Sequence, residues 1–423
     1  MDVLYPRCAG LDVHKATIVA CVRIMAGAKT TRACRTFETS TTGLQALLAW
    51  LTEQGCTHVA MEATGVYWKP VWNILSDGGF ELIVANAAHI KAVPGRKSDV
   101  NDTTWIADLL ACGLIRASFV PAQEFQELRA LLRTRTQLTR EQTRHSQRLQ
   151  KTLEEANIKL DSAISDVMGV SGRRMVEAII AGETNPVVLA ALADRRIKTP
   201  RAELVEALRG RVTEHHRFML RLYLDQHDRV AEAIATIDAE IDTVVAHMDH
   251  KEVAGQAAFR ALILLLTTVP GVGQLAATII LAEIGTDMSR FPTAGHLLSW
   301  AGFCPGQNES AGKRRSAKLR KGAPWLKVIL VQCARAASRT KGKYYKAQFW
   351  RLCARHGKKK AACAVAASML TAIYHMLKDG TEHQDLGAEY FDRRPPEAKA
   401  KKLVGQLAKL GFAVELRPIA EAA

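Results

Sequence analysis

The sequence lacks any pair of cysteines at the C-x-x-C spacing, although it contains nine cysteines. This absence argues against a zinc ribbon, and the odd number argues against a disulfide framework. No apolar run long enough to span a membrane is present, because residues 261–269 form too short a stretch. The first residues also lack the basic and apolar regions of a signal peptide. We therefore expect reduced, mostly buried thiols in a cytoplasmic protein with no membrane association.

Negative charge is missing from one long segment near the C-terminus. Residues 311–360 contain seventeen Lys and Arg residues and no Asp or Glu. This segment alone is large enough to supply the formal net charge of +16. Because such a surplus favours a polyanionic partner, the composition indicates nucleic-acid binding.

The first 120 residues alternate between strand-like and helix-like patterns. Strands are predicted within 9–24 around a turn at His14-Lys15, and at 31–38, 58–62 and 81–85. Helices are predicted at 42–54, 66–75 and 98–112. Three early strands followed by alternating strands and helices predict an α/β domain over residues 1–120, with a mixed sheet and helices on its faces.

The middle region, residues 121–257, is predicted to be helical. Residues 124–160 form a polar helical stretch with an interrupted leucine seam. A second stretch has apolar and His residues at alternating spacings of three and four, namely Leu220, Tyr223, His227, Val230, Ile234, Ile237, Ile241, Val244 and Met248. This heptad seam predicts a coiled coil, whose partner is either residues 124–160 or another subunit.

Residues 258–380 are predicted to form a mainly α-helical basic domain, followed by a loosely ordered tail at 381–423. Residues 268–273, Thr-Val-Pro-Gly-Val-Gly, predict a tight turn between two apolar helices. Such a turn either presents backbone amides to phosphate, as in a helix-hairpin-helix, or is a buried connection between helices.

Four carboxylates stand where a divalent cation could bind. Asp12 lies within an otherwise uncharged strand, and Glu62 ends another strand. Asp99 and Asp102 are three residues apart at the start of a helix, which places both on one face. Carboxylate oxygens are the ligands that Mg²⁺ prefers, and a mid-strand Asp is unfavourable without a reason. Each acid alone could instead be a helix cap or a solvated residue.

The sequence around these acids resembles a known family. The blocks Gly10–Lys15, Met61–Gly65 and Lys97–Asp102 are similar to the signature blocks of the DEDD transposases of insertion sequences, the IS-one-ten family. The resemblance implies a RuvC-like domain of RNase H fold, with these four acids binding Mg²⁺ or Mn²⁺. It also implies a double-stranded DNA substrate and a guide non-coding RNA. The predicted coiled coil would join protomers, so we expect a homo-oligomer, a dimer or tetramer.

The resemblance continues in the basic domain through 269–273, 282–285, 300–305 and 309–313. In the family, a serine in the last block is the nucleophile on DNA, and the matching residue is Ser310. The family often has two adjacent serines, whereas Glu309-Ser310-Ala311 offers one. Without the resemblance, Ser310 is interpreted as a turn serine. Ser299 is a rival serine that we expect to pack or to bond back to its own helix.

Cations close to Ser310 are expected to hold phosphate groups. We predict nucleic-acid contacts for eight of them, Lys313, Arg314, Arg315, Lys318, Arg320, Lys321, Lys341 and Lys343. Aromatic residues are interleaved with the cations further on, and we expect Phe349 and Trp350 to belong to the core.

The sequence therefore predicts a transposase or site-specific recombinase. A metal-dependent nuclease of the Holliday-junction-resolvase type is one alternative, in which Ser310 has no role. A basic DNA-binding protein with a degenerate nuclease domain is another, and a coiled-coil scaffold is a third.

Overall fold

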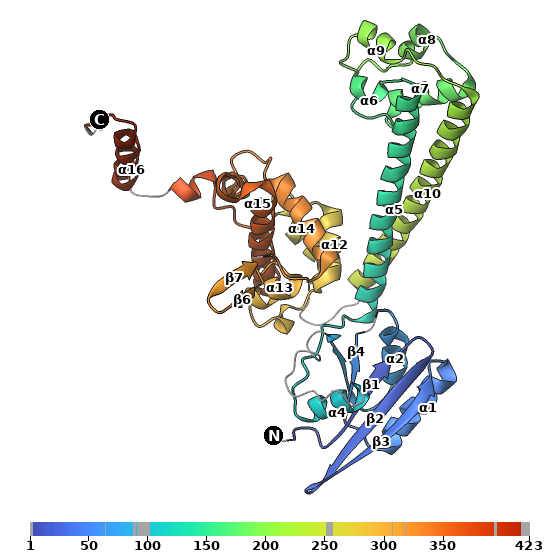
Figure 1. Cartoon of the computed structure of the whole chain (residues 1–423), viewed down its shortest axis with the longest axis vertical. Helices are drawn as coiled ribbons and strands as arrows, with labels where there is room; N and C mark the ends of the chain where they lie inside the picture. Colours follow the sequence, from blue (N-terminus) through green and yellow to red (C-terminus); the bar gives the residue numbers. More distant parts are fainter. Residues whose placement is uncertain are drawn as a thin grey trace. The chain divides into compact units, whose positions relative to one another are not determined.

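The computed structural model describes residues 3–63, 65–87, 90, 102–250, 257–306, 308–316, 318–392 and 396–415. The chain divides into two units, Met1–Pro121 and Ala122–Ala423. The first unit is built on a β-sheet and the second is almost entirely helical (Figure 1).

The first unit, called the sheet unit below, contains a five-stranded mixed sheet in the order β3-β2-β1-β4-β5. The strands are β1 (Arg7–Val13), β2 (Thr17–Ala26), β3 (Lys29–Glu38), β4 (His58–Glu62) and β5 (Glu81–Ala85). β1 is antiparallel to β2 and parallel to β4, which is itself parallel to β5. The predicted mixed sheet is therefore confirmed.

Helices cover both faces of this sheet. One face packs against α1 (Thr41–Glu53) and α2 (Trp68–Leu75) through Leu11, Val59 and Met61. The opposite face packs against α4 (Asp102–Ala111) through Cys8, Ala60 and Ile106. Alternation of side chains along the strands explains this division, because neighbouring residues of β1 point to opposite faces.

α4 lies so close to β1 that only glycine fits beneath it. A Cβ atom on Gly10 would lie 2.4 Å from the Thr103 carbonyl oxygen and 2.6 Å from the Ala107 nitrogen. The absence of a side chain at Gly10 therefore sets the distance between helix and sheet.

In the second unit, the helical unit, two long helices form an antiparallel pair (Figure 1). They are α5 (Gln123–Glu155) and α10 (Glu214–His250). Leu220 packs in one cluster with Leu149 and Leu153, whereas Ile241 packs in another with Leu128. The predicted heptad helix is confirmed, and it packs against α5 of its own chain. Four short helices complete the far end, namely α6 (Leu160–Ala163), α7 (Val170–Ala181), α8 (Pro186–Ala191) and α9 (Arg201–Ala207).

The remainder of the helical unit is a helical domain with a small β-ribbon. Its elements are α11 (Phe259–Thr267), α12 (Gln274–Ile284), η1 (Met288–Arg290), α13 (Ala294–Ala301), β6 (Asn308–Ser310), β7 (Lys313–Ser316), α14 (Pro324–Ala337) and α15 (Tyr344–Asp379). The turn between α11 and α12 packs closely against α14, because a Cβ atom on Gly271 would lie 2.5 Å from the Cys333 carbonyl oxygen. Val269 and Val272 of this turn are buried, whereas Gly271 and Gly273 are exposed, so both interpretations of residues 268–273 stay open.

α15 is a long, kinked helix that differs from one expectation. It extends from Tyr344 to Asp379, and its two helical segments meet at a kink at Gly357, where φ is 78°. Within the described residues, it is also the one helix long and apolar enough to cross a membrane, which we did not expect from the sequence. Half of that apolar window is buried, and Val365, Met369 and Ile373 are fully buried in the domain core. A core helix satisfies the same criterion of length and composition.

Two further expectations need correction. The tail is not uniformly irregular, because η2 (Ala388–Asp392) and α16 (Pro396–Lys409) are helical. All nine cysteines are free thiols, but only Cys8, Cys21, Cys56 and Cys333 are buried. Cys34 is exposed, because it lies on the edge strand β3.

Candidate metal centre and nucleic-acid interface

Strand register places two of the four predicted acids side by side. β1 and β4 are parallel, and Leu11 pairs with Met61. The next residues along these two strands are Asp12 and Glu62, so they occupy equivalent positions at the carboxyl ends of neighbouring strands. Residues at equivalent positions point to the same face, which here is the face covered by α4.

The direction of α4 brings Asp102 toward the same end of the sheet. The C-terminal residue of α4, Ala111, accepts a hydrogen bond from the Leu4 backbone, just before β1 begins. In the middle of the helix, Ala107 accepts one from the Cys8 thiol, and Thr103 lies over Gly10. The helix therefore runs opposite to β1, and its first residue, Asp102, lies toward the Asp12 end. Asp99 lies outside the described residues.

Asp12 has a histidine neighbour. Its Oδ2 atom is 3.1 Å from Nε2 of His14, and its side chain is 25% exposed. Among the described residues, no three Asp, Glu, His or Cys side chains are grouped closely enough to hold a metal ion. The donor chemistry nevertheless suits a hard divalent cation, because two carboxylates are adjacent and a third begins the helix above them.

Ser310 is the last residue of β6 in a two-stranded hairpin. It pairs with Lys313 across the two-residue turn Ala311-Gly312. Both turn residues have positive φ, 49° and 72°, as in the tight turns that match the twist of β-hairpins. Ser310 is therefore held at the tip of a ribbon whose second strand is Lys-Arg-Arg-Ser.

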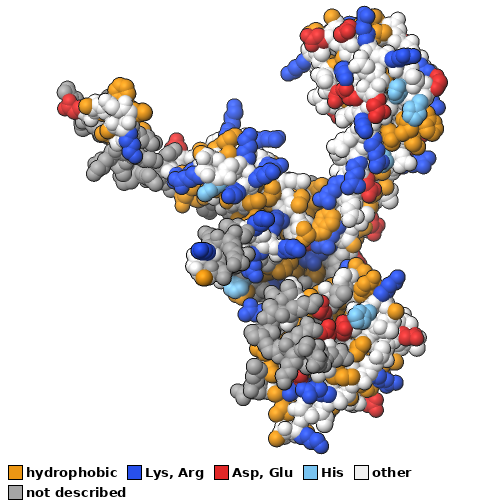
Figure 2. All heavy atoms as spheres, in the orientation of Figure 1, with side chains coloured by type: hydrophobic (Ala, Val, Ile, Leu, Met, Phe, Trp, Pro, Cys, Tyr) orange, Lys and Arg blue, Asp and Glu red, His pale blue; other side chains and the backbone are white. Residues whose placement is uncertain are grey.

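The predicted DNA-contacting cations lie on the outside of the helical unit. The six whose side chains are described are all exposed: Lys313, Lys318, Arg320, Lys321, Lys341 and Lys343. Arg314 and Arg315 belong to β7, and their side chains lie outside the described part of the structure. Figure 2 shows Lys and Arg side chains gathered over the domain of α14 and α15, whereas acidic and basic side chains are mixed around α6–α9. The basic segment is thus an exposed cationic surface.

Comparison with known proteins assigns the chain to a family. Residues 9–158 match the DEDD transposase family of IS110, described as "Transposase", and residues 264–349 match "Transposase IS116/IS110/IS902 family". The two matches together cover more than half of the chain. The chain belongs to the IS110 family of insertion-sequence transposases.

Two relatives resemble this transposase over most of their length. The "Insertion element IS110 uncharacterized 43.6 kDa protein" of Streptomyces coelicolor is 26% identical over 315 residues, 69% of this chain and 73% of the relative. The "Transposase for insertion sequence element IS1111A" of Coxiella burnetii is 26% identical over 331 residues, 76% of this chain and 78% of the relative. The enzyme class is therefore that of a DNA transposase, and membership of a DEDD family implies dependence on a divalent metal.

The structure corrects one of two sequence-based expectations about the basic domain of the transposase. Ser299 is half-buried, and its hydroxyl accepts a hydrogen bond from Nη1 of Arg320 at 3.4 Å. Trp350 is not a core residue, because it is 52% exposed, whereas its neighbour Phe349 is buried as expected. Consecutive residues on a helix face different directions, so the pair could not share one environment.

A buried acid that joins two helices of the transposase was missed by reasoning from the sequence. Glu283 of α12 is 3% exposed and accepts two hydrogen bonds of 2.8 Å from Arg133 of α5. Arg129 donates to the backbone carbonyls of Ala282 and Glu283, and burial lowers its pKa to about 10. The signal was present, because Glu283 is an acid within an otherwise apolar helix, as Asp12 is within an apolar strand.

Proposed function

We propose that this transposase cuts and rejoins DNA at the ends of its insertion sequence, with a metal centre in an RNase H-like sheet unit and a serine nucleophile in the helical unit. Asp12, Glu62, Asp99 and Asp102 are the proposed ligands, and Mg²⁺ or Mn²⁺ is the proposed ion. The observation that carries the proposal is the register of β1 and β4, which makes Asp12 and Glu62 neighbours beneath the helix that Asp102 begins.

Each group has a defined task in this proposal. A divalent cation held by the carboxylates would neutralise charge on the scissile phosphate. The Ser310 hydroxyl oxygen would attack the phosphorus, so that a serine–phosphate bond forms and the bond to one deoxyribose oxygen breaks. The serine would lose its proton to a base, and the departing deoxyribose oxygen would gain one. Lys313, which pairs with Ser310 across the hairpin, carries a cation that could stabilise the developing charge.

Two further parts of the proposal are supported by family resemblance. Duplex DNA would bind the cationic surface, and a guide non-coding RNA would choose the sites. The domain limits are proposed at residues 120, 257 and 380, and the protein is proposed to act in the cytoplasm. A homo-oligomer, a dimer or tetramer, is also proposed. Because the α10 seam packs on α5 of the same chain, the contact between protomers would use another surface.

The test measures cleavage of DNA carrying the element's own ends, with the guide RNA present, and traps any covalent protein–DNA product. Asp12→Asn is expected to lower cleavage on the order of 10³-fold, because metal ions contribute several kcal/mol to such reactions. Ser310→Ala is expected to abolish the covalent product. Asp77→Asn and Ser289→Ala are the matched controls, since Asp77 is exposed beyond α2 and Ser289 is an exposed serine of the helical unit.

Two outcomes would contradict the proposal in different ways. Normal cleavage by the Ser310→Ala protein, with loss in the Asp12→Asn protein, would indicate a metal-only nuclease of the resolvase type. Normal cleavage by the Asp12→Asn protein would disprove the metal centre.

A further inference from the structure

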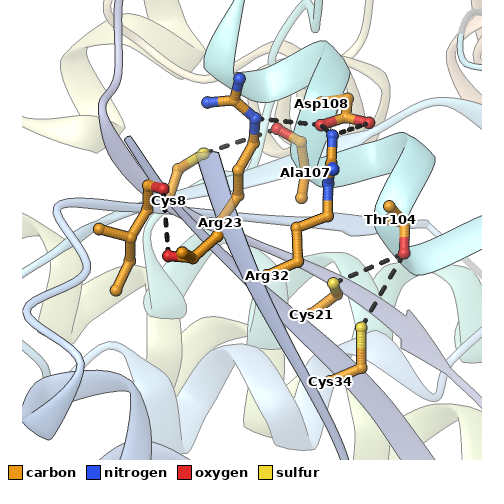
Figure 3. Close-up of polar contacts among 10 residues, drawn as sticks. Cys8, Cys21, Arg23, Arg32, Cys34, Thr104, Ala107 and Asp108 are labelled. Atoms are coloured by element: carbon orange, nitrogen blue, oxygen red, sulfur yellow. Dashed lines mark hydrogen bonds and ion pairs between the residues drawn. The ribbon is translucent and has the colours of Figure 1, made fainter. Parts of the chain in front are cut away.

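Two cysteines of the sheet unit face each other across neighbouring strands. Cys21 of β2 pairs directly with Cys34 of β3, and Cys21 also pairs with Gly10 of β1. The three residues form one row across the sheet, on the face that α4 covers. Figure 3 shows both sulfur atoms pointing toward Thr104 of α4.

Thr104 connects the two thiols to the helix. Its hydroxyl donates to the Cys21 sulfur at 3.5 Å and lies 3.9 Å from the Cys34 sulfur. The next pair on this face of the sheet is Arg23 of β2 and Arg32 of β3. Both arginines donate hydrogen bonds to Asp108 of α4. The reduced thiols therefore occupy a position next to an ion-paired contact between helix and sheet.

The backbone geometry permits a bond between the two sulfurs. Residues directly opposite in an antiparallel pair have Cα atoms about 4.5–5.5 Å apart. Disulfides join Cα atoms about 4.4–6.8 Å apart, so no rearrangement of the strands is needed. The Cβ atoms of such pairs lie about 4.5–5.5 Å apart, near or beyond the upper limit of disulfides, which favours a bond that is easily reduced.

The two thiols differ in their access to solvent. Cys34 lies on the edge strand and is exposed, whereas Cys21 has no exposed surface. Burial, followed by hydrogen bonding to Cys34, raises the pKa of the Cys21 thiol to about 11. In redox-sensing pairs, an accessible thiol is oxidised to a sulfenic acid, and a neighbouring thiol then converts the sulfenic acid to a disulfide. An exposed thiol beside a buried one fits this arrangement.

We propose that Cys21 and Cys34 form a reversible thiol–disulfide pair that responds to peroxide. The Cys34 thiolate attacks one oxygen of hydrogen peroxide; a sulfur–oxygen bond forms, the oxygen–oxygen bond breaks, and the released oxygen leaves as water. The Cys21 sulfur then attacks the Cys34 sulfenic acid. The sulfur–sulfur bond forms, and the sulfur–oxygen bond breaks to release a second water. Both thiols are oxidised, and one peroxide is reduced to two waters.

The proposal goes beyond the proposed transposition chemistry and does not depend on it. In the disulfide neither sulfur carries a proton, so Cys34 could no longer donate to Thr104. The Thr104 hydroxyl could still donate to the Cys21 sulfur, and Asp108 could still pair with its two arginines, so these contacts between α4 and the β2–β3 edge do not require the thiol protons.

The experiment treats the full chain with hydrogen peroxide, blocks the remaining thiols, and maps the peptides by mass spectrometry under non-reducing conditions. We expect a peptide pair linked through Cys21 and Cys34, with loss of two hydrogens, that disappears after treatment with dithiothreitol. Cys34→Ser should remove this product completely. Cys112→Ser, a change at a half-buried thiol of the same unit, should leave its yield unchanged.

Because Cys34 is exposed, the Cys34→Ser protein should fold even if a change at buried Cys21 does not. Cys34 recovered as a sulfinic acid, or in a disulfide between two chains, with Cys21 still a free thiol, would overturn the proposal. A linked peptide that forms equally fast through Cys112 would also overturn it.

Discussion

The sheet unit and the helical unit hold their candidate residues by different means. In the sheet unit, backbone pairing between β1 and β4 makes Asp12 and Glu62 neighbours. In the helical unit, a β-hairpin carries Ser310, and the predicted DNA-contacting cations lie on β7 and in the loops before α14 and α15. Side chains such as Glu283 and Arg133 hold α12 to α5. The first arrangement follows from strand register, whereas the second depends on contacts between distant side chains. The difference indicates where each unit should be sensitive to substitution.

The buried ion pair of the helical unit should give the largest effect on stability. Glu283→Ala leaves Arg129 and part of Arg133 buried without a counter-charge, so we expect the free energy of unfolding to fall by about 3–5 kcal/mol. Calorimetry of the full chain measures the change. Glu141→Ala on the exposed side of α5 is the control, with no expected effect. Equal stability of the two variants would mean that side-chain contacts are not what holds α12 to α5.

The close approach of α4 and β1 should be the most sensitive point of the sheet unit. In Gly10→Ala, the new methyl group would overlap Thr103 and Ala107, so we expect a loss of about 1–3 kcal/mol from overpacking. Thermal unfolding measures this loss, with Gly79→Ala as the control, because Gly79 has no positive φ and no atom lies within 4 Å of a Cβ placed there. A smaller loss at Gly10 than at Gly79 would contradict the proposed spacing.

The salt dependence of DNA binding should change on substitution in the helical unit and not on substitution in the sheet unit. Replacing both Lys341 and Lys343 by Ala removes two exposed cations, so we expect the slope of log affinity against log salt to fall by about one for each phosphate that is no longer neutralised. Binding to duplex DNA at several salt concentrations measures the slope. Lys29→Ala, on an exposed residue of the sheet unit, should leave it unchanged. An equal change for Lys29 would disprove the assignment of DNA binding to the basic segment.

The smallest effect is expected at the far end of the long helices, and it should depend on pH. Arg173 donates two hydrogen bonds of 2.7 and 2.5 Å to Asp228, and these bonds hold the pKa of that carboxyl below its usual value of 3.8. A carboxyl whose pKa is lowered by folding stabilises the folded state above its usual pKa, and the contribution is lost as pH falls through the folded pKa.

We therefore expect Asp228→Asn to cost up to about 1 kcal/mol at neutral pH, since the pair is about one-third exposed and is screened by solvent. The difference from the wild-type protein should shrink in acid, as thermal unfolding below pH 3.8 would measure. A difference that grows in acid would mean that the carboxylate does not stabilise the fold.

Local patterns are enough to predict much of the fold. The strands 58–62 and 81–85 have the predicted limits, because each is a short apolar run bounded by turn residues. The heptad seam predicts the helix 214–250, but it does not predict the partner, because a seam does not specify what covers it.

Parts of the candidate site depend on information that a single strand or helix does not contain. Asp12 can be recognised as a candidate from the sequence because an Asp in the middle of a strand is unfavourable. Glu62 can be recognised because the block around it resembles a family signature. That the two acids are neighbours follows only from the pairing of β1 with β4. The exposure of Trp350 and the burial of Glu283 likewise depend on distant helices, and local periodicity could not separate them from their neighbours.

The ion pair between Glu283 and Arg133 lies nearer the first end of the long helix α5. α5 has 33 residues, which gives it a length of about 50 Å at 1.5 Å per residue. Arg133 lies in its first third, whereas α6–α9 follow its other end. The helix is about 33 Å long from Arg133 to Glu155, so a rotation of about one degree at this ion pair would displace the other end by about 0.6 Å. A small shift of the Glu283 carboxylate would thus produce a larger displacement of α6–α9 at the other end of the two long helices.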